Sequence, residues 1–165
     1  MRKLSLAALA VVTAASAASP VAAATVTTNL GVKIVIQASC TVSAPAAGLD
    51  FGTAGVLTAN IDQSANLTVQ CTNTLPYRIL LGAGAGTGAT VTTRNMTGTA
   101  GAIVNYALYR DSTRALNWGE TIGTDAFTGT GNGAAQSIPV YGRVPAQTTP
   151  AAGTYTDTVL VTVDY

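Results

Sequence analysis

The 165-residue chain contains no histidine, only 5% aromatic residues and only 9% charged residues. Without histidine it lacks the usual general base, the commonest metal ligand and any catalytic triad that needs imidazole. Its net charge of +1 provides no basic excess to neutralise nucleic-acid phosphates. These absences argue against an enzyme and against a nucleic-acid-binding protein, and we expect no cofactor and no metal.

The first 24 residues have the features of a secretory signal peptide. Arg2 and Lys3 precede an apolar stretch over residues 4–12, and small residues continue to Ala24. A membrane anchor would need about 20 continuous apolar residues, and polar residues and a proline interrupt this segment. We expect cleavage before Thr25, which leaves six basic and seven acidic residues and a net charge of −1.

Cys40 and Cys71 are the only cysteines. In an exported chain an isolated pair is most simply one disulfide. A redox or metal role would require CxxC spacing or further ligands, and the sequence has neither. We therefore predict a structural disulfide, worth about 3–4 kcal/mol in the chain-entropy model.

The rest of the chain is rich in strand and turn formers. It contains 17 glycines and many threonines, and Lys33 is the only lysine beyond the predicted signal. This composition predicts an all-β domain. Apolar alternation and turn signals predict strands over residues 64–72, 76–81, 135–144 and 154–165.

Residues 102–118 could form a helix, because this segment lacks proline and contains Ala107 and Leu108. Val104, Tyr106 and Leu108 alternate, however, and β-branched and aromatic residues crowd the segment. We favour a strand and keep the helix as the alternative.

Other candidate sites in the sequence are weak. The glycine-rich stretches 84–89 and 129–134 lack the following helix that a dinucleotide site requires, and are interpreted as surface turns. The scattered acidic residues favour turn capping, although a facing pair in a glycosidase cleft stays open. These residues are Asp50, Asp62, Asp111, Glu120, Asp125, Asp157 and Asp164. Trp118 with nearby tyrosines could form a sugar-stacking platform, and core packing is the commoner use.

The N-terminal part of the predicted mature chain carries a long period-2 pattern. Its even positions from Val26 to Cys40 are mainly apolar and its odd positions mainly polar or small. Strands average five or six residues, so this run is longer than one edge of a small domain needs. It could be the first strand of the domain's own sheet, or a strand donated to a neighbour.

The other end of the sequence is also an alternating strand. Val159, Val161, Val163 and Tyr165 alternate with mainly polar residues, and no further strand follows in the sequence. An uncovered apolar edge is an aggregation hazard unless another strand pairs with it. A spare N-terminal strand from a neighbouring molecule could do so, and such head-to-tail exchange generates a filament.

Five motifs in this order resemble the spore coat protein U domain, whose members form the subunits of archaic, or Csu-type, chaperone-usher pili. They are Leu49-Asp50-Phe51-Gly52, Leu67-Thr68-Val69-Gln70-Cys71, Asn105-Tyr106-Ala107-Leu108-Tyr109-Arg110-Asp111, Ile138-Pro139-Val140-Tyr141-Gly142, and the ending from Ala152 through Tyr155 to Tyr165. The resemblance covers essentially all of the predicted mature chain. It implies an incomplete immunoglobulin-like β-sandwich that lacks its last strand and is completed by a donor strand from another chain.

The resemblance also implies partners and sites. A periplasmic chaperone lends a strand during export, an outer-membrane usher catalyses exchange, and the next subunit's N-terminal extension replaces the chaperone in a cell-surface fimbrium that supports adhesion and biofilm formation. We expect a donor extension over residues 25–38 and a pilin domain over 39–165. The predicted donor residues are Val26, Leu30, Val32, Ile34 and Ile36, and the predicted acceptor residues are Val159, Val161, Val163 and Tyr165.

We predict a shaft subunit, because the mature length leaves no room for a second domain of ordinary size. Two alternatives remain open from the sequence. One is a non-fimbrial coat protein of a spore, cyst or cell surface, which the family name allows. The other is a small carbohydrate-binding module that uses Trp118.

Overall fold

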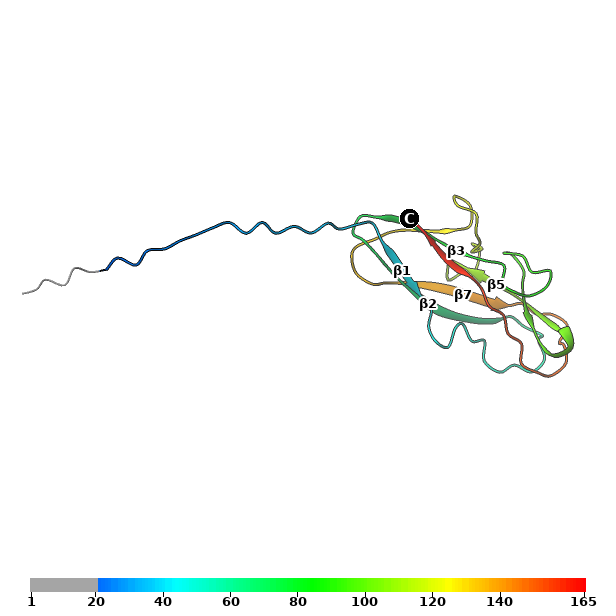
Figure 1. The fold of residues 1–165 in the computed structure, drawn as a ribbon. Coiled ribbons are helices and arrows are strands. Elements are labelled where there is room, and N and C mark those ends of the chain that lie inside the picture. The colour runs from blue at the N-terminus through cyan, green and yellow to red at the C-terminus, as the bar shows by residue number, and fades with distance from the viewer. Residues whose placement is uncertain (1–20) are drawn as a thin grey trace, which may run out of the picture. The chain divides into compact units, whose positions relative to one another are not determined.

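The computed structural model describes residues 21–165 (Figure 1). The predicted signal peptide lies outside the described residues except for its last four. The described chain divides into two units, with the boundary between Val35 and Ile36. No helix within residues 21–165 is long and apolar enough to span a membrane.

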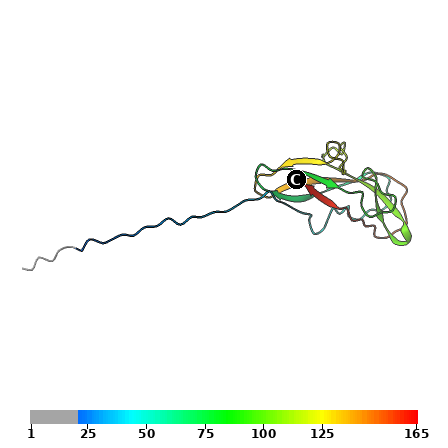
Figure 2. The ribbon, with the colours of Figure 1, turned by 45° about the horizontal axis from the view of Figure 1, so that its top comes forward.

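The second unit is built from two antiparallel β-sheets (Figures 1 and 2). The five-stranded sheet has the order β1-β2-β7-β5-β4, and the three-stranded sheet has the order β6-β3-β8. The strands are β1 (Cys40–Ser43), β2 (Ile61–Cys71), β3 (Pro76–Leu81), β4 (Arg94–Thr97), β5 (Ile103–Tyr109), β6 (Phe127–Thr130), β7 (Gln136–Val144) and β8 (Val161–Asp164). The predicted all-β class is confirmed.

Alternating residues of both sheets form one core. Side chains on a strand point to opposite faces in turn, so β2 buries Leu67 and Val69 while β3 buries Ile79 and Leu81. Trp118 lies at the centre with no exposed surface, and its Nε1 donates to the carbonyl oxygen of Ile79 at 2.9 Å. The core therefore joins the two sheets through apolar side chains and one satisfied indole.

Several predicted strands match the structure closely. β3 has the predicted bounds, β7 begins one residue later than predicted, and β2 begins three residues earlier and ends one residue earlier. The segment 102–118 contains the favoured strand, β5, and the helical alternative is wrong. The predicted disulfide between Cys40 and Cys71 is present and joins the first residue of β1 to the last residue of β2.

Other predicted elements need correction. The predicted strand 154–165 is reduced to β8, preceded by an extended segment that makes one bridge, from Thr156 to Thr97 of β4. The stretch 129–134, predicted as a turn, begins within β6. Gly129 fits this strand because a Cβ there would lie 2.5 Å from the Tyr77 ring, so only glycine lets the ring cover the backbone.

Candidate functional site

Strands β1 and β8 lie next to each other at the edges of the two sheets. Within residues 21–165, β1 pairs only with β2, β8 pairs only with β3, and β1 contacts β8 across the sandwich. The second edge of β8 has no strand partner in the described chain. Backbone N–H and C=O groups on such an edge can pair with a strand from another molecule.

An open cavity of about 1160 Å³ lies between the sheets. Most residues of the segments 44–57 and 149–161 line it, together with side chains from both sheets, including Leu67, Leu81 and Val140. Protein interiors have few voids larger than a water molecule. A cavity of this size is therefore a groove that can accept several side chains rather than a packing defect.

The predicted acceptor residues do not all line this groove. Val159 and Val161 line it. Val163 is half-buried against the core but lies outside the lining, and Tyr165 is 57% exposed. The alternation of inward and outward residues continues through residues 155–164 although only β8 is a regular strand, so the wall of the groove is longer than the strand.

Gly142 supports a wall of the groove that the sequence reasoning missed. It occupies an inward position of β7 between the buried Val140 and Val144. A Cβ at Gly142 would lie 2.8 Å from Phe51 and 2.9 Å from Leu49. The side chains of the 49–51 loop therefore fill the space that this glycine leaves, and they form a wall of the groove. The signal in the sequence was a glycine at an inward position of an apolar strand.

Asp157 fixes the opposite wall. Its Oδ2 accepts a hydrogen bond from the Tyr106 hydroxyl at 2.7 Å, and its Oδ1 accepts bonds from the backbone N–H groups of Ala85 and Thr158, both at 2.7 Å. Burial, followed by the hydrogen bond to Asp157, raises the pKa of Tyr106. The carboxylate was expected to cap a turn, and it instead ties the segment before β8 to two other parts of the fold.

The predicted donor extension forms no regular strand in the described structure. Its side chains are highly exposed, with Leu30 at 87%, Val32 at 89% and Ile34 at 81%, and Val26 and Ile36 are exposed as well. The alternative that Leu30–Ile36 is the first strand of the chain's own sheet is wrong, because the first strand begins at Cys40. Exposed apolar residues in such a row are a characteristic of an interaction segment.

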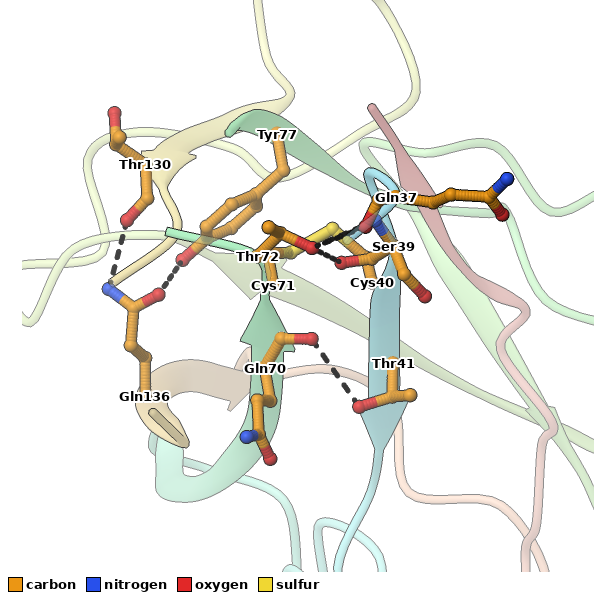
Figure 3. The surroundings of a disulfide bond; sticks show 10 residues. All are labelled: Gln37, Ser39, Cys40, Thr41, Gln70, Cys71, Thr72, Tyr77, Thr130 and Gln136. Atoms are coloured by element: carbon orange, nitrogen blue, oxygen red, sulfur yellow. Dashed lines mark hydrogen bonds between the residues drawn. A yellow bond between two sulfur atoms is a disulfide. The ribbon is translucent and has the colours of Figure 1, made fainter. Parts of the chain in front are cut away.

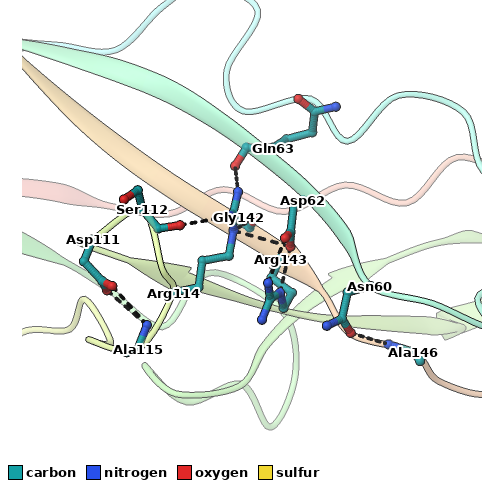
Figure 4. Close-up of polar contacts among 10 residues, drawn as sticks. All are labelled: Asn60, Asp62, Gln63, Asp111, Ser112, Arg114, Ala115, Gly142, Arg143 and Ala146. Atoms are coloured by element: carbon teal, nitrogen blue, oxygen red, sulfur yellow. Dashed lines mark hydrogen bonds and ion pairs between the residues drawn. The ribbon is translucent and has the colours of Figure 1, made fainter.

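A charged cluster missed by the sequence reasoning joins β2, β7 and the loop after β5 (Figure 4). Arg143 donates to both carboxylate oxygens of Asp62 at 2.7 Å, and Arg114 lies 3.4 Å from the same carboxylate. The hydrogen bond from Arg143, with the charge of Arg114, holds the pKa of Asp62 below its usual range. None of these three residues lines the groove, so the cluster has a structural role.

The other candidate sites prove to be structural. Trp118 is fully buried and stacks on Phe127 with ring centroids 5.4 Å apart, so the predicted sugar-stacking alternative is wrong and core packing is its role. Asp50, Asp111 and Asp125 accept backbone N–H bonds in turns, as predicted. No group of three potential metal-ligating His, Cys, Asp or Glu side chains occurs in the part of the chain that the structure describes.

Comparisons with known proteins agree with this architecture. The family model of the spore coat protein U domain matches residues 26–162. Protein U of Myxococcus xanthus is 37% identical over 174 aligned residues, which cover 96% of this chain and 97% of that protein.

One of the similar solved structures has a TM-score of 0.56. It is a chain of the CsuC–CsuE chaperone–tip adhesion subunit pre-assembly complex from the archaic chaperone-usher Csu pili of Acinetobacter baumannii. The identity is 23%, and the match covers 79% of this chain and 40% of that one, so the present chain spans less than half of that chain. The likeness supports a shared sandwich fold.

Proposed function

This chain belongs to the spore coat protein U domain family, and from that membership we propose that it is a structural subunit of a chaperone-usher surface pilus that polymerises by donor-strand exchange. In this proposal residues 26–36 of one subunit enter the groove beside β8 of the next. Leu30, Val32, Ile34 and Ile36 point into the groove, and the backbone pairs with the free edge of β8. The role is structural, not catalytic.

One observation carries the proposal: the same chain contains both halves of a possible strand exchange. The groove beside β8 offers apolar side chains and an unpaired strand edge within the described residues. The extension offers a row of apolar side chains at alternate positions, each more than two-thirds exposed from Leu30 to Ile36. Each half is costly to expose in water, and insertion of one into the other removes both costs.

Burial of the donor side chains is the main energy that would hold such a polymer together. Burying a large aliphatic side chain is worth about 1.5–3 kcal/mol, so four of them contribute about 6–12 kcal/mol before the entropy of ordering the extension. Backbone hydrogen bonds to the edge of β8 add to this. A contact of this strength between successive subunits makes a head-to-tail filament, because the two surfaces are different and do not close on themselves.

The proposal also names partners and a location. A periplasmic chaperone would occupy the groove during export, an outer-membrane usher would catalyse exchange, and the product would be a cell-surface fimbrium with roles in adhesion and biofilm formation. The structural neighbour from Acinetobacter baumannii is itself a complex with a chaperone, which supports a chaperone partner. We propose a shaft position, with residues 25–38 as the extension and 39–165 as the pilin domain.

The test is co-expression of the exported protein with a chaperone encoded beside it. We expect a soluble 1:1 complex, and long thin fibres after the chaperone is removed. A variant that lacks residues 25–36 should still form the chaperone complex but no fibres, since it keeps the groove and loses the donor. A chain without the extension that is a stable, soluble monomer with no partner would contradict the proposal.

A second candidate is a non-fimbrial coat protein, which the description of the matching family, the spore coat protein U domain, supports. Electron microscopy of sheared surface material distinguishes the two. Thin fibres support the pilus, and an amorphous shell supports the coat.

A further inference from the structure

The root of the extension is held by Thr72, directly beside the disulfide (Figure 3). The Thr72 hydroxyl accepts a bond from the Ser39 N–H at 3.0 Å and lies 3.2 Å from the carbonyl oxygens of both Gln37 and Ser39, to either of which it can donate. The Thr72 N–H also donates to the Ser39 carbonyl oxygen at 2.9 Å. We call this set of contacts, between Thr72 and residues 37–39, the root clasp.

The root clasp requires an extended backbone at residues 37–39. In an extended chain the carbonyl groups of residues i and i+2 point to the same side, which is how Gln37 and Ser39 both reach one hydroxyl. A hairpin turn at these residues would point the two carbonyls in different directions. The clasp therefore continues the line of β1 beyond Cys40 and opposes a reversal of the chain there.

The topology shows what such a reversal would do. Cys40 at the start of β1 pairs with Cys71, a short turn leads to β3, and Arg78 near the start of β3 pairs with Asp164 at the end of β8. The start of β1 and the end of β8 therefore lie at the same end of the sandwich. The full donor segment up to Ile36 can enter the groove of its own molecule only if the chain turns back between Ile36 and Cys40, at residues 37–39. Insertion into another molecule needs no such turn.

Intramolecular insertion would otherwise have the advantage. A short flexible tether gives an effective concentration in the millimolar range, well above the micromolar concentrations of separate subunits. A monomer that fills its own groove could not extend a filament. Resting on the proposed function, we propose that the root clasp of Thr72 suppresses insertion of the extension into its own groove and so directs it to a second copy of this chain.

The experiment compares the exported protein with three variants, each unfolded with its disulfide intact and refolded at micromolar concentration. Thr72→Val keeps the shape and removes the hydroxyl, whereas Thr72→Ser is the matched control that keeps it. A double variant, Gln37→Asn with Ala38→Gly, favours a hairpin turn without altering the sandwich. Light scattering measures the ratio of monomer to polymer, and hydrogen exchange measures protection of residues 26–36 in each species.

We expect Thr72→Val to raise the ratio of monomer with a protected extension to polymer by about fivefold to tenfold, the effect of one lost hydrogen bond. The double variant should raise the same ratio, because it favours the turn. Thr72→Ser should behave like the original protein. If polymers of the original protein protect residues 26–36 and neither altered protein changes the ratio, the clasp inference is overturned and the pilus proposal stands. If residues 26–36 are unprotected in every species of the original protein, the pilus proposal fails, and the inference with it.

Discussion

Arg94 donates from Nη2 to the carbonyl oxygen of Trp118 at 2.8 Å, at a point in the core where neither residue is exposed. The same guanidinium donates to the carbonyl oxygens of Leu81, Gly82 and Val91 at distances of 2.7–2.9 Å. Burial lowers the pKa of Arg94, yet arginine stays charged under all ordinary conditions. Its charge is stabilised by four backbone dipoles, and in return it satisfies four carbonyl groups in and around the core.

Replacing Arg94 with methionine should therefore lower the free energy of unfolding by about 3–5 kcal/mol, because several buried carbonyl groups lose their donor at once. The stability of Arg94→Lys should lie between that of the original protein and that of the methionine variant, because an ammonium group cannot reproduce the planar fork of the guanidinium. Urea unfolding measures both. Arg78→Met is the matched control: Arg78 forms an exposed ion pair with Asp164 and should change stability by less than about 1 kcal/mol. Equal effects at the two sites would contradict the role of Arg94.

Asp62 should make stability depend on acid pH. Because Arg143 and Arg114 hold its pKa below the ordinary value of 3.8, the folded state binds a proton less readily than the unfolded state. Its contribution is complete above about pH 5 and is lost as the pH falls through the folded pKa. The pair is partly exposed, so we expect an effect of no more than about 1 kcal/mol.

The measurement is urea unfolding of the original protein and of Asp62→Asn at pH 7 and pH 3. At pH 7 the variant should be less stable, and at pH 3 the difference should be smaller. Asp111 also has a lowered pKa, of about 2, through its bonds from Thr113 and from the backbone of Leu116 and Ala115. Comparing two proteins that share Asp111 removes its contribution. A difference that is the same at both pH values would show that the ion pair does not stabilise the fold.

The disulfide should matter most for β1, a four-residue edge strand that pairs only with β2 in the described structure. Replacing Cys40 and Cys71 with serine should lower the free energy of unfolding by about 3 kcal/mol. Hydrogen exchange should show loss of protection in β1 before any other strand, because the cross-link attaches its first residue. Uniform loss of protection across both sheets would mean instead that β1 is an integral part of the cooperative unit.

Period-2 alternation predicted the strands whose inward residues are apolar, and it failed where they are not. β3 and β7 show the pattern openly in their sequences. β4 has the polar residues Arg94 and Asn95 at its buried positions, so its sequence resembles a loop. β6 contains Gly129, and glycine is needed there because the ring of Tyr77, from another strand, packs against its backbone. These residue choices depend on contacts between distant segments, so they cannot be understood from the sequence of one strand.

The same limit applies to the groove. Val159 and Val161 could be predicted because they alternate along one segment. The wall formed by Leu49 and Phe51 could not, since it depends on a loop that folds over Gly142 of a strand some 90 residues away. The root clasp likewise joins distant segments, since Thr72 lies next to Cys71 of the disulfide and contacts residues 37–39 at the end of the extension. Local periodicity thus predicts strands and proposes donor residues, whereas contacts between loops and strands define the shape of the groove.

The period-2 pattern of the extension gives the sharpest test of strand exchange. Ile34 and Val35 are neighbours, both highly exposed at 81% and 67%, and neither contributes to the core. In a strand, Ile34 lies on the same face as Leu30, Val32 and Ile36, whereas Val35 lies on the opposite face, so of the two only Ile34 should enter a groove. Ile34→Asp should therefore slow or abolish fibre formation, since burying an unpaired carboxylate costs several kcal/mol.

Val35→Asp places the same charge one residue away on the opposite face of the strand, and it should leave fibre formation within about threefold of the original, an effect smaller than that of one hydrogen bond. Both variants should form the chaperone complex in the same yield as the original, because neither residue contributes to the core. Fibre growth followed by light scattering compares the three proteins directly. Equal inhibition by both substitutions would show that the extension acts through overall charge or hydrophobicity rather than as a strand with one buried face.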